Sequence, residues 1–244
     1  MLARPPASKK AIVYGPILSW RLGRSLGVDL LGSKEKYCSF DCVYCELGNG
    51  THHVVRRKEF VTIERLKSAL EKVGERPFDY VTFSGSGEPT LASNLGEAID
   101  LVKAVLKKPV AVLTNSVLMT REDVRQDLAK ADVVIAKIDA PDEETYRRVD
   151  KPWVRTPLGD IIKAIKTFKA GYRGKFGLQM MFVAANKHLS KEMAAVAREI
   201  APDEVYLNTP LRSCPVPPLS REEMVEIKSA FNGIENVRMV YDEH

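Results

Sequence analysis

Short apolar runs alternate with longer segments in which apolar side chains recur every three or four positions. The runs are typical of buried β-strands, and the recurrence is typical of amphipathic helices. We predict strands at residues 25–31, 79–84, 110–114, 133–138, 177–183, 204–207 and 237–241. We predict helices at residues 64–73, 95–106, 121–129, 142–149, 160–170, 191–200 and 221–231.

Such alternation favours an α/β fold with a parallel sheet and crossover helices. The pattern amounts to about six strand–helix units, which is too few for an eight-unit barrel. A length of 244 residues fits a single large domain.

Composition narrows the class of protein. Hydrophobic residues make up 45% and charged residues 28%, which excludes a disordered chain, a collagen and a disulfide-rich miniprotein. No stretch approaches the ~18 apolar residues of a membrane helix, and residues 1–10 show no apolar signal-peptide core. We therefore expect a cytoplasmic protein with no membrane partner. The net charge of +5 permits an anionic partner without requiring one.

Three of the four cysteines, Cys38, Cys42 and Cys45, fall in the segment CSFDCVYC. Four randomly placed cysteines would produce this spacing in roughly 4 of 10,000 arrangements, so chance is a poor explanation. Disulfides are rare in cytosolic proteins. Structural zinc needs four ligands, and His52 or His53 is a candidate for the fourth. Cysteine thiolates also hold iron–sulfur clusters, and three of them leave one iron of a four-iron cluster open.

The C-x3-C-x-aromatic-C pattern, with Tyr44 as the aromatic residue, resembles the signature of the radical S-adenosylmethionine (radical SAM) superfamily. The resemblance implies a [4Fe-4S] cluster on the three cysteines and S-adenosylmethionine chelated at the open iron. One-electron reduction, by a ferredoxin- or flavodoxin-type donor, then yields methionine and a 5′-deoxyadenosyl radical that abstracts hydrogen from substrate.

The resemblance also implies a partial (β/α)6 barrel. The expected domain is residues 1–244, with a core at about 25–211. A short N-terminal extension, residues 1–24, precedes the core, and a helix and strand at 219–244 follow it.

Polar residues at predicted strand ends are further site candidates, because strand ends line the site in barrel folds. The turn SGSGEP after residues 79–84 resembles the family's "GGE" motif, with Ser86, Gly87 and Glu88 at the three positions. That motif binds the amino group of S-adenosylmethionine; an ordinary turn is the alternative. Asn115 stands in a turn resembling the family's Thr-Asn-Gly, where it binds ligand or forms an Asx turn.

Four more polar residues fall at or near later strand ends. Lys137 and Asp139 are candidates for the ribose or carboxylate of S-adenosylmethionine, or for a surface ion pair. A polar residue among apolar neighbours needs a hydrogen-bond partner when it is buried. Gln179 and Asn208 therefore face either ligand or a protein partner.

Arg21 and Arg24 lie in the segment RLGRSLG, which resembles the entry segment of a single-cluster radical SAM branch related to the tRNA wyosine-base synthases. Guanidinium groups pair with carboxylate and phosphate, so the two arginines are candidates for the cofactor carboxylate or a substrate phosphate. A surface pair is the alternative. Cys214 is either a buried inert thiol or a hydrogen-atom donor. The basic run at residues 56–58 is either a solvated face or a phosphate contact.

Three functions remain open. The first is an enzyme acting on tRNA or another RNA; wyosine synthesis itself is disfavoured because the archaeal enzymes resembling this family carry extra cysteines. The second is a glycyl-radical activase acting on a protein partner, and a small-molecule substrate is also open. The third is a non-catalytic metal-binding protein, which would leave Gly87 and Glu88 unexplained.

Overall fold

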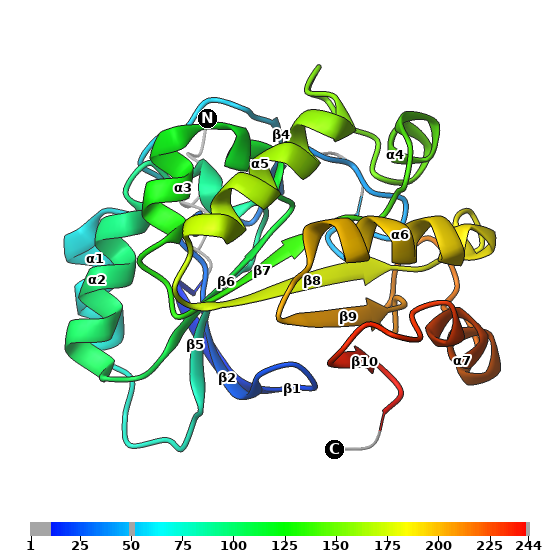
Figure 1. Cartoon of the computed structure of the whole chain (residues 1–244). Helices are drawn as coiled ribbons and strands as arrows, with labels where there is room; N and C mark the ends of the chain where they lie inside the picture. The colour runs from blue at the N-terminus through cyan, green and yellow to red at the C-terminus, as the bar shows by residue number, and fades with distance from the viewer. Residues whose placement is uncertain (1–10, 49–51, 243–244) are drawn as a thin grey trace, which may run out of the picture.

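A curled eight-stranded sheet forms the centre of the computed structural model, which describes residues 11–48 and 52–242 (Figure 1). Strand β1 is antiparallel to β2, and each later strand is parallel to its neighbour. In sheet order, the strands are β1 (Val13–Ser19), β2 (Gly23–Val28), β5 (Tyr80–Phe83), β6 (Val110–Thr114), β7 (Val133–Lys137), β8 (Lys175–Met181), β9 (Glu204–Asn208) and β10 (Val237–Met239). A separate two-residue pair joins β3 (Tyr37–Cys38) to β4 (His52–His53).

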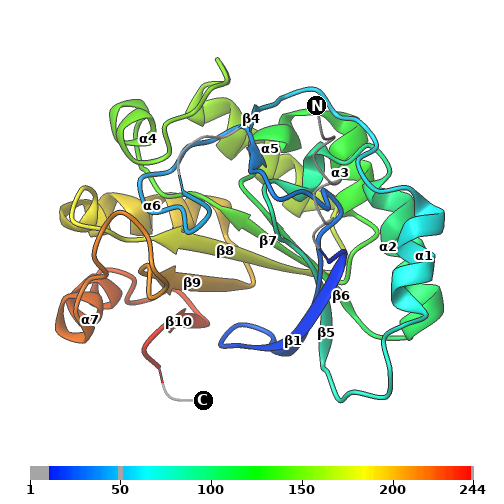
Figure 2. The same cartoon turned by 180° about the vertical axis from the view of Figure 1, so that it is seen from behind.

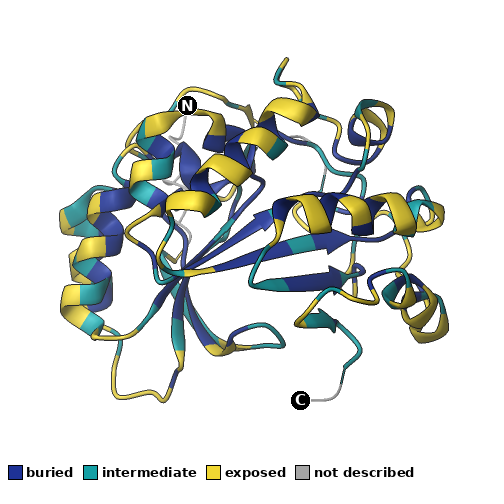
Figure 3. Cartoon of the chain, viewed as in Figure 1, coloured by how far each residue is buried: buried dark blue, intermediate teal, exposed yellow. Residues whose placement is uncertain are grey.

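The helices lie along the outer face of the curled sheet (Figures 1 and 2). They are α1 (Ile63–Leu70), α2 (Leu95–Leu106), α3 (Glu122–Leu128), α4 (Glu143–Val149), α5 (Leu158–Gly171), α6 (Ser190–Ile200) and α7 (Arg221–Ser229), with 3-10 turns η1 (Pro89–Leu91), η2 (Val117–Thr120) and η3 (Lys187–Leu189). Each helix buries its sheet-facing side and exposes the other, as Figure 3 shows. None of the helices described is both long enough and apolar enough to cross a membrane.

The strand–helix alternation confirms the predicted partial barrel. Each strand from β2 to β9 that belongs to the large sheet is followed by at least one helix, which makes six units, and β10 adds a final parallel strand. The two ends of the sheet, β1 and β10, are not neighbours in it, so the barrel stays open.

Strand β1 was not predicted, because Gly15 and Pro16 interrupt its alternation. These residues lie at a register shift in the pairing of β1 with β2. Residues 13–19 of the segment expected as an extension thus form the edge strand of the main sheet.

The turn between β1 and β2 reaches the far end of the sheet. The ring of Trp20 packs edge-on against Tyr206 of β9, with centroids 5.7 Å apart. Arg238 of β10 donates a hydrogen bond of 2.6 Å to the Trp20 carbonyl. This contact bridges the open side of the barrel at the amino ends of its strands.

Strand register shows which side chains face the inside of the curl. Lys137 pairs with Gln179, and Gln179 pairs with Tyr206. Paired residues on adjacent strands point to the same side, and so do residues two apart on one strand. The side chains of Lys137, Gln179, Tyr206 and Asn208 therefore share the inner face.

Candidate functional site

The segment that carries the three clustered cysteines, residues 37–45 (the cysteine segment), lies against the carboxyl ends of the parallel strands. The Tyr37 amide donates to the Ser86 carbonyl at 3.0 Å, and the Glu88 amide donates to the Tyr37 carbonyl at 2.9 Å. A Cβ at Gly87 would lie 1.7 Å from the Tyr37 carbonyl oxygen. Gly87 is therefore needed for the segment to approach this turn, whether or not it also contacts a ligand.

Asp29 fixes the same turn from the end of β2. Its buried carboxylate accepts hydrogen bonds from the Ser86 amide at 3.0 Å and from the Ser86 hydroxyl at 2.7 Å. A Cβ at Gly85 would lie 2.5 Å from its carboxyl carbon. Sequence reasoning missed Asp29, although an aspartate inside the apolar run of residues 25–31 was a usable signal.

Glu88 holds the ends of β5 and β6 together. One carboxylate oxygen accepts from the amide and hydroxyl of Thr90 and from the hydroxyl of Thr114, and the other accepts from the Asn115 amide at 2.7 Å. Burial raises the pKa of this carboxyl, and these hydrogen bonds oppose the shift. The carboxylate is only 3% exposed, so its contacts in this structure are positional.

Asn115 connects the β6 turn to the cysteine segment. Its side-chain oxygen accepts from the Val117 amide at 3.1 Å, which is the Asx-turn alternative. Its amide nitrogen donates to the Ser39 hydroxyl at 2.9 Å and lies 3.5 Å from the Cys38 sulfur. Ser116 follows with φ of 75°, at the position where the family motif has glycine.

A buried charge network surrounds Lys137. Its amine lies 2.9 Å from an Asp139 carboxylate oxygen, 2.8 Å from the Tyr44 hydroxyl and 3.5 Å from the Cys42 sulfur, and it also pairs with Asp150. Burial lowers the pKa of Lys137, but the two carboxylates outweigh it and the net pKa is raised. The predicted pair of Lys137 and Asp139 is therefore an interior pair beside a cysteine. Asp150 is a member that sequence reasoning missed.

The three clustered cysteines are free and partly buried. Burial raises the pKa of the Cys38 thiol to about 11 and that of the Cys42 thiol well above its ordinary value, while Lys137 opposes both shifts. A raised pKa favours the protonated thiol, so binding a metal at these two cysteines would release protons. A cation beside Cys42 suits a thiolate, so this donor set fits an iron–sulfur cluster.

Within residues 11–48 and 52–242, no three histidine, cysteine or acidic side chains converge as ligands of one metal ion. A four-iron cluster does not require such convergence, because each thiolate binds a different iron.

The side-chain amides of Gln179 and Asn208 lie on the inner face of the sheet, beside the network around Lys137. Both residues are partly exposed. Neither side-chain amide has a hydrogen-bond partner among the residues that the structure describes. Both amides are therefore available to a ligand.

The two predicted arginines separate. Arg24 lies at the amino end of β2, half exposed, and pairs with Asp79 at 3.1 Å. The structure does not bring Arg24 to the cysteine segment. Arg21 instead lies over the Trp20 ring, 5.1 Å from its centroid.

Cys214 lies near the site without joining the cysteine segment. It packs against a small cluster that contains Tyr44 and Met181, and its thiol donates to the Val216 carbonyl at 3.0 Å. Arg212, two residues earlier, pairs with Glu46 of the cysteine loop at 3.0 Å.

The two histidines and the basic run at residues 56–58 lie in different surroundings in the structure. His53 stacks on the exposed ring of Trp153, with centroids 3.7 Å apart, and the Trp153 amide donates to the Ser39 carbonyl. His52 pairs with Glu35 at 2.6 Å. In the basic run, the Arg57 side chain is only 7% exposed and pairs with Asp123 and Asp127, so it stabilises the fold.

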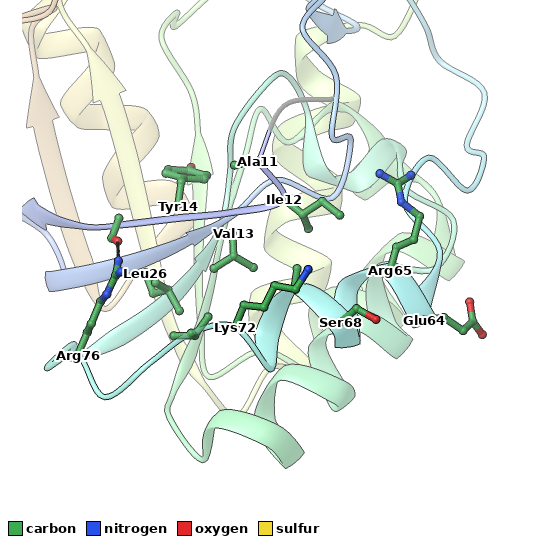
Figure 4. A pocket seen from close by; sticks show the side chains of 13 residues that line it. Ala11, Ile12, Val13, Tyr14, Leu26, Glu64, Arg65, Ser68, Lys72 and Arg76 are labelled. Atoms are coloured by element: carbon green, nitrogen blue, oxygen red, sulfur yellow. Dashed lines mark hydrogen bonds between the residues drawn. The ribbon is translucent and has the colours of Figure 1, made fainter. Parts of the chain in front are cut away.

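A groove of about 640 Å³ lies elsewhere, between β1 and α1 (Figure 4). Lys72, Arg65 and Ser68 of the α1 region line one side, and Arg76 donates to the Gly15 carbonyl at 3.3 Å. It contains none of the cysteines or the inner-face polar residues, so we do not assign it to the site.

The sequence of residues 36–200 matches the model of a protein family described as the radical SAM superfamily. The chain belongs to this superfamily. Radical SAM enzymes use S-adenosylmethionine and an iron–sulfur cluster, and they require a reductant. The protein is thus a radical SAM enzyme by family, with an open α/β barrel as its fold.

Two relatives are similar over most of the chain. A UPF0026 protein of Methanocaldococcus jannaschii is 34% identical over 91% of this chain and 72% of its own length. A UPF0026 protein of Synechocystis is 37% identical over 84% of this chain and 77% of its own length.

Solved structures share the fold at low identity. The structure of TYW1 with a bound lysine–pyruvate adduct superposes with a TM-score of 0.67 at 17% identity, covering 88% of this chain and 76% of that chain. Streptococcus suis SuiB bound to its precursor peptide SuiA gives 0.65 at 16% identity, covering 84% and 47%. These similarities establish the fold alone.

Proposed function

We propose that Cys38, Cys42 and Cys45 hold a [4Fe-4S] cluster and that the protein abstracts hydrogen from a substrate with the aid of S-adenosylmethionine. One observation carries the proposal. Three free thiols lie on one segment that is hydrogen-bonded to the carboxyl ends of the strands, and the largely buried Lys137 amine lies 3.5 Å from one of them. When bound, the cluster and S-adenosylmethionine supply one-electron cleavage to methionine and a 5′-deoxyadenosyl radical.

The chain's own residues would bind and orient the cofactor. The Lys137 amine, beside Cys42, would donate a hydrogen bond to the ribose or carboxylate of S-adenosylmethionine, and Asp139 and Asp150 hold that amine in position. The turn at Ser86 and Gly87 offers polar backbone next to the cysteine segment, and Glu88 keeps that turn in place.

The inner face of the sheet would receive the substrate. Asn115 fastens the segment that carries Cys38, and Gln179 and Asn208 present free amides on the same face as Lys137. Tyr44 packs behind the cysteines with its ring buried, which excludes water from the network around Lys137.

RNA, with tRNA as the first candidate, is the substrate class that a specific surface feature favours. The exposed ring of Trp153, stacked with His53, stands beside the cysteine segment, and the exposed cations Lys151 and Arg155 flank it. Aromatic rings that stack bases, combined with cations that contact phosphates, are the usual means of binding single-stranded RNA.

The test is the yield of 5′-deoxyadenosine from protein reconstituted anaerobically with iron and sulfide, reduced with dithionite and supplied with S-adenosylmethionine. We expect wild-type protein to form 5′-deoxyadenosine. Cys42→Ala should lose the cluster and all product, because two thiolates do not retain a four-iron cluster. Cys214→Ser is the matched control and should retain the wild-type iron content, because that thiol lies outside the cysteine segment. Product from Cys42→Ala would overturn the cluster assignment.

A second arm adds bulk tRNA from the source organism. Product that rises with tRNA in wild-type protein but not in Trp153→Ala supports the RNA assignment. Product that is indifferent to tRNA removes RNA as substrate and leaves the radical chemistry intact.

A further inference from the structure

Arg21 places a guanidinium group at the open side of the barrel. It belongs to the turn between β1 and β2, whose Trp20 packs on Tyr206 of the inner face. Leu22, the next residue, is buried with Tyr206 and Ile135 in a small apolar cluster. Arg21 thus lies between two residues, Trp20 and Leu22, that both pack with Tyr206 of the inner face.

The guanidinium group of Arg21 forms no ion pair within residues 11–48 and 52–242. Its Nε atom is buried with no hydrogen-bond partner, and no carboxylate pairs with it among the described residues. Burial lowers the pKa of Arg21 to about 10. The Arg21 cation lies instead over the face of the Trp20 ring, in a cation–π contact. Arg21 as a whole is partly exposed, but a buried guanidinium nitrogen without a partner is unfavourable for the fold, and a ligand oxyanion would supply both the partner and the opposite charge.

Glu46, an acid near Arg21, already pairs with another arginine. Glu46 lies close enough to influence Arg21, but both of its carboxylate oxygens accept from Arg212 at 3.0 Å. By contrast, Arg24 in the same hairpin has Asp79 as a partner. Two arginines three residues apart therefore differ in whether the protein neutralises them.

We propose that Arg21 binds an oxyanion, carboxylate or phosphate, of the substrate on the inner face of the sheet. This inference rests on the proposed radical SAM function. Guanidinium forms paired hydrogen bonds with either group.

The cofactor has a different cation. Lys137 on β7 contacts Cys42 and Tyr44, whereas Arg21 lies beside Tyr206 on β9. Strand β8 separates them, so the two strands lie about 10 Å apart. The free amide of Gln179 faces inward between them. A substrate anchored at Arg21 would lie across Gln179 toward the cysteine segment.

The test measures the thermal unfolding midpoint of the reconstituted protein with inorganic phosphate, with acetate, and with chloride at equal ionic strength. The unfolding midpoint of wild-type protein should rise, and the rise should saturate, with at least one of the two oxyanions. The larger rise identifies the preferred group. Arg21→Met keeps an apolar side chain over Trp20 and should be at least as stable as wild type in chloride. The oxyanion concentration that gives half of the maximal rise in its unfolding midpoint should be at least tenfold higher than in wild type. Arg24→Met is the matched control and should respond as wild type does.

Three results would overturn the assignment. The first is an absence of oxyanion effect in wild-type protein, and the second is an undiminished effect in Arg21→Met. The third is competition between S-adenosylmethionine and the oxyanion, which would give Arg21 to the cofactor. Dithionite-driven 5′-deoxyadenosine formation is measured on the same samples. If wild-type protein forms none, the proposed function fails while the oxyanion result is still read separately.

Discussion

At the residue scale, the tightest constraint is the approach of Tyr37 to Gly87. No side chain fits there, because its first carbon would overlap a backbone oxygen that cannot rotate away. Gly87 therefore determines whether the cysteine segment can sit at the strand ends.

We expect Gly87→Ala to displace the cysteine segment and to reduce iron retention severalfold after reconstitution, with a loss of stability of about 1–3 kcal/mol. Gly159→Ala is the matched control, since a Cβ there meets open space in α5. Iron content and urea unfolding check both variants. Wild-type iron content in Gly87→Ala would show that the segment docks in another way.

Several site residues were predictable because residue type and spacing in the sequence identify them. The spacing of Cys38, Cys42 and Cys45 is independent of how the chain folds. The positions of Glu88 and Lys137 follow from their strands. Their contacts were not predictable from sequence. Asp29 meets Ser86, two residues before Glu88, and Asp150 meets Lys137 only in the folded chain, and isolated aspartates carry no motif.

At the element scale, Arg57 joins the loop before α1 to the start of α3. Its guanidinium donates to Asp123 at 2.8 Å and to the Thr90 and Ala92 carbonyls. The hydrogen bond from Arg121, followed by that from Arg57, lowers the pKa of Asp123 well below its usual range.

A lowered acid pKa gives stability that is complete above the unfolded value near 4 and is lost as pH falls toward the folded value. We therefore expect Asp123→Asn to lose at most about 1 kcal/mol at pH 7, because the group is half exposed. Its urea midpoint should then fall less than that of wild type between pH 4 and pH 2.5. Asp160→Asn, in the exposed first turn of α5, should keep the wild-type pH profile. Equal acid sensitivity in Asp123→Asn and wild type would contradict this role.

Most elements followed from periodicity, since each buries an apolar face. Strand β1 did not, because its exposed residues and its Gly15-Pro16 step remove the alternation. The predicted strand at residues 25–31 ends earlier, at Val28, because Asp29 accepts from the Leu31 and Gly32 amides in a turn.

At the scale of the whole molecule, the barrel is bridged by side chains across its open side. Arg238 and Tyr206 meet Trp20 from the opposite end of the sheet. This bridge also positions Arg21, so the shape of the barrel and the proposed oxyanion site depend on the same turn.

We expect Arg238→Ala to lower the free energy of unfolding by about 1–3 kcal/mol, since the Trp20 carbonyl loses a charged donor. Hydrogen exchange should quicken in both β1–β2 and β10, because the bridge joins them. Faster exchange confined to β10 would mean that the hairpin holds its place without the bridge.

The most direct test of the central claim is the electron paramagnetic resonance spectrum of the reduced, reconstituted protein before and after addition of S-adenosylmethionine. The three proposed cysteine ligands would leave one iron open, so we expect a four-iron signal whose g values change when S-adenosylmethionine binds. A reduced cluster whose spectrum does not change on addition of S-adenosylmethionine would contradict the proposed cofactor site.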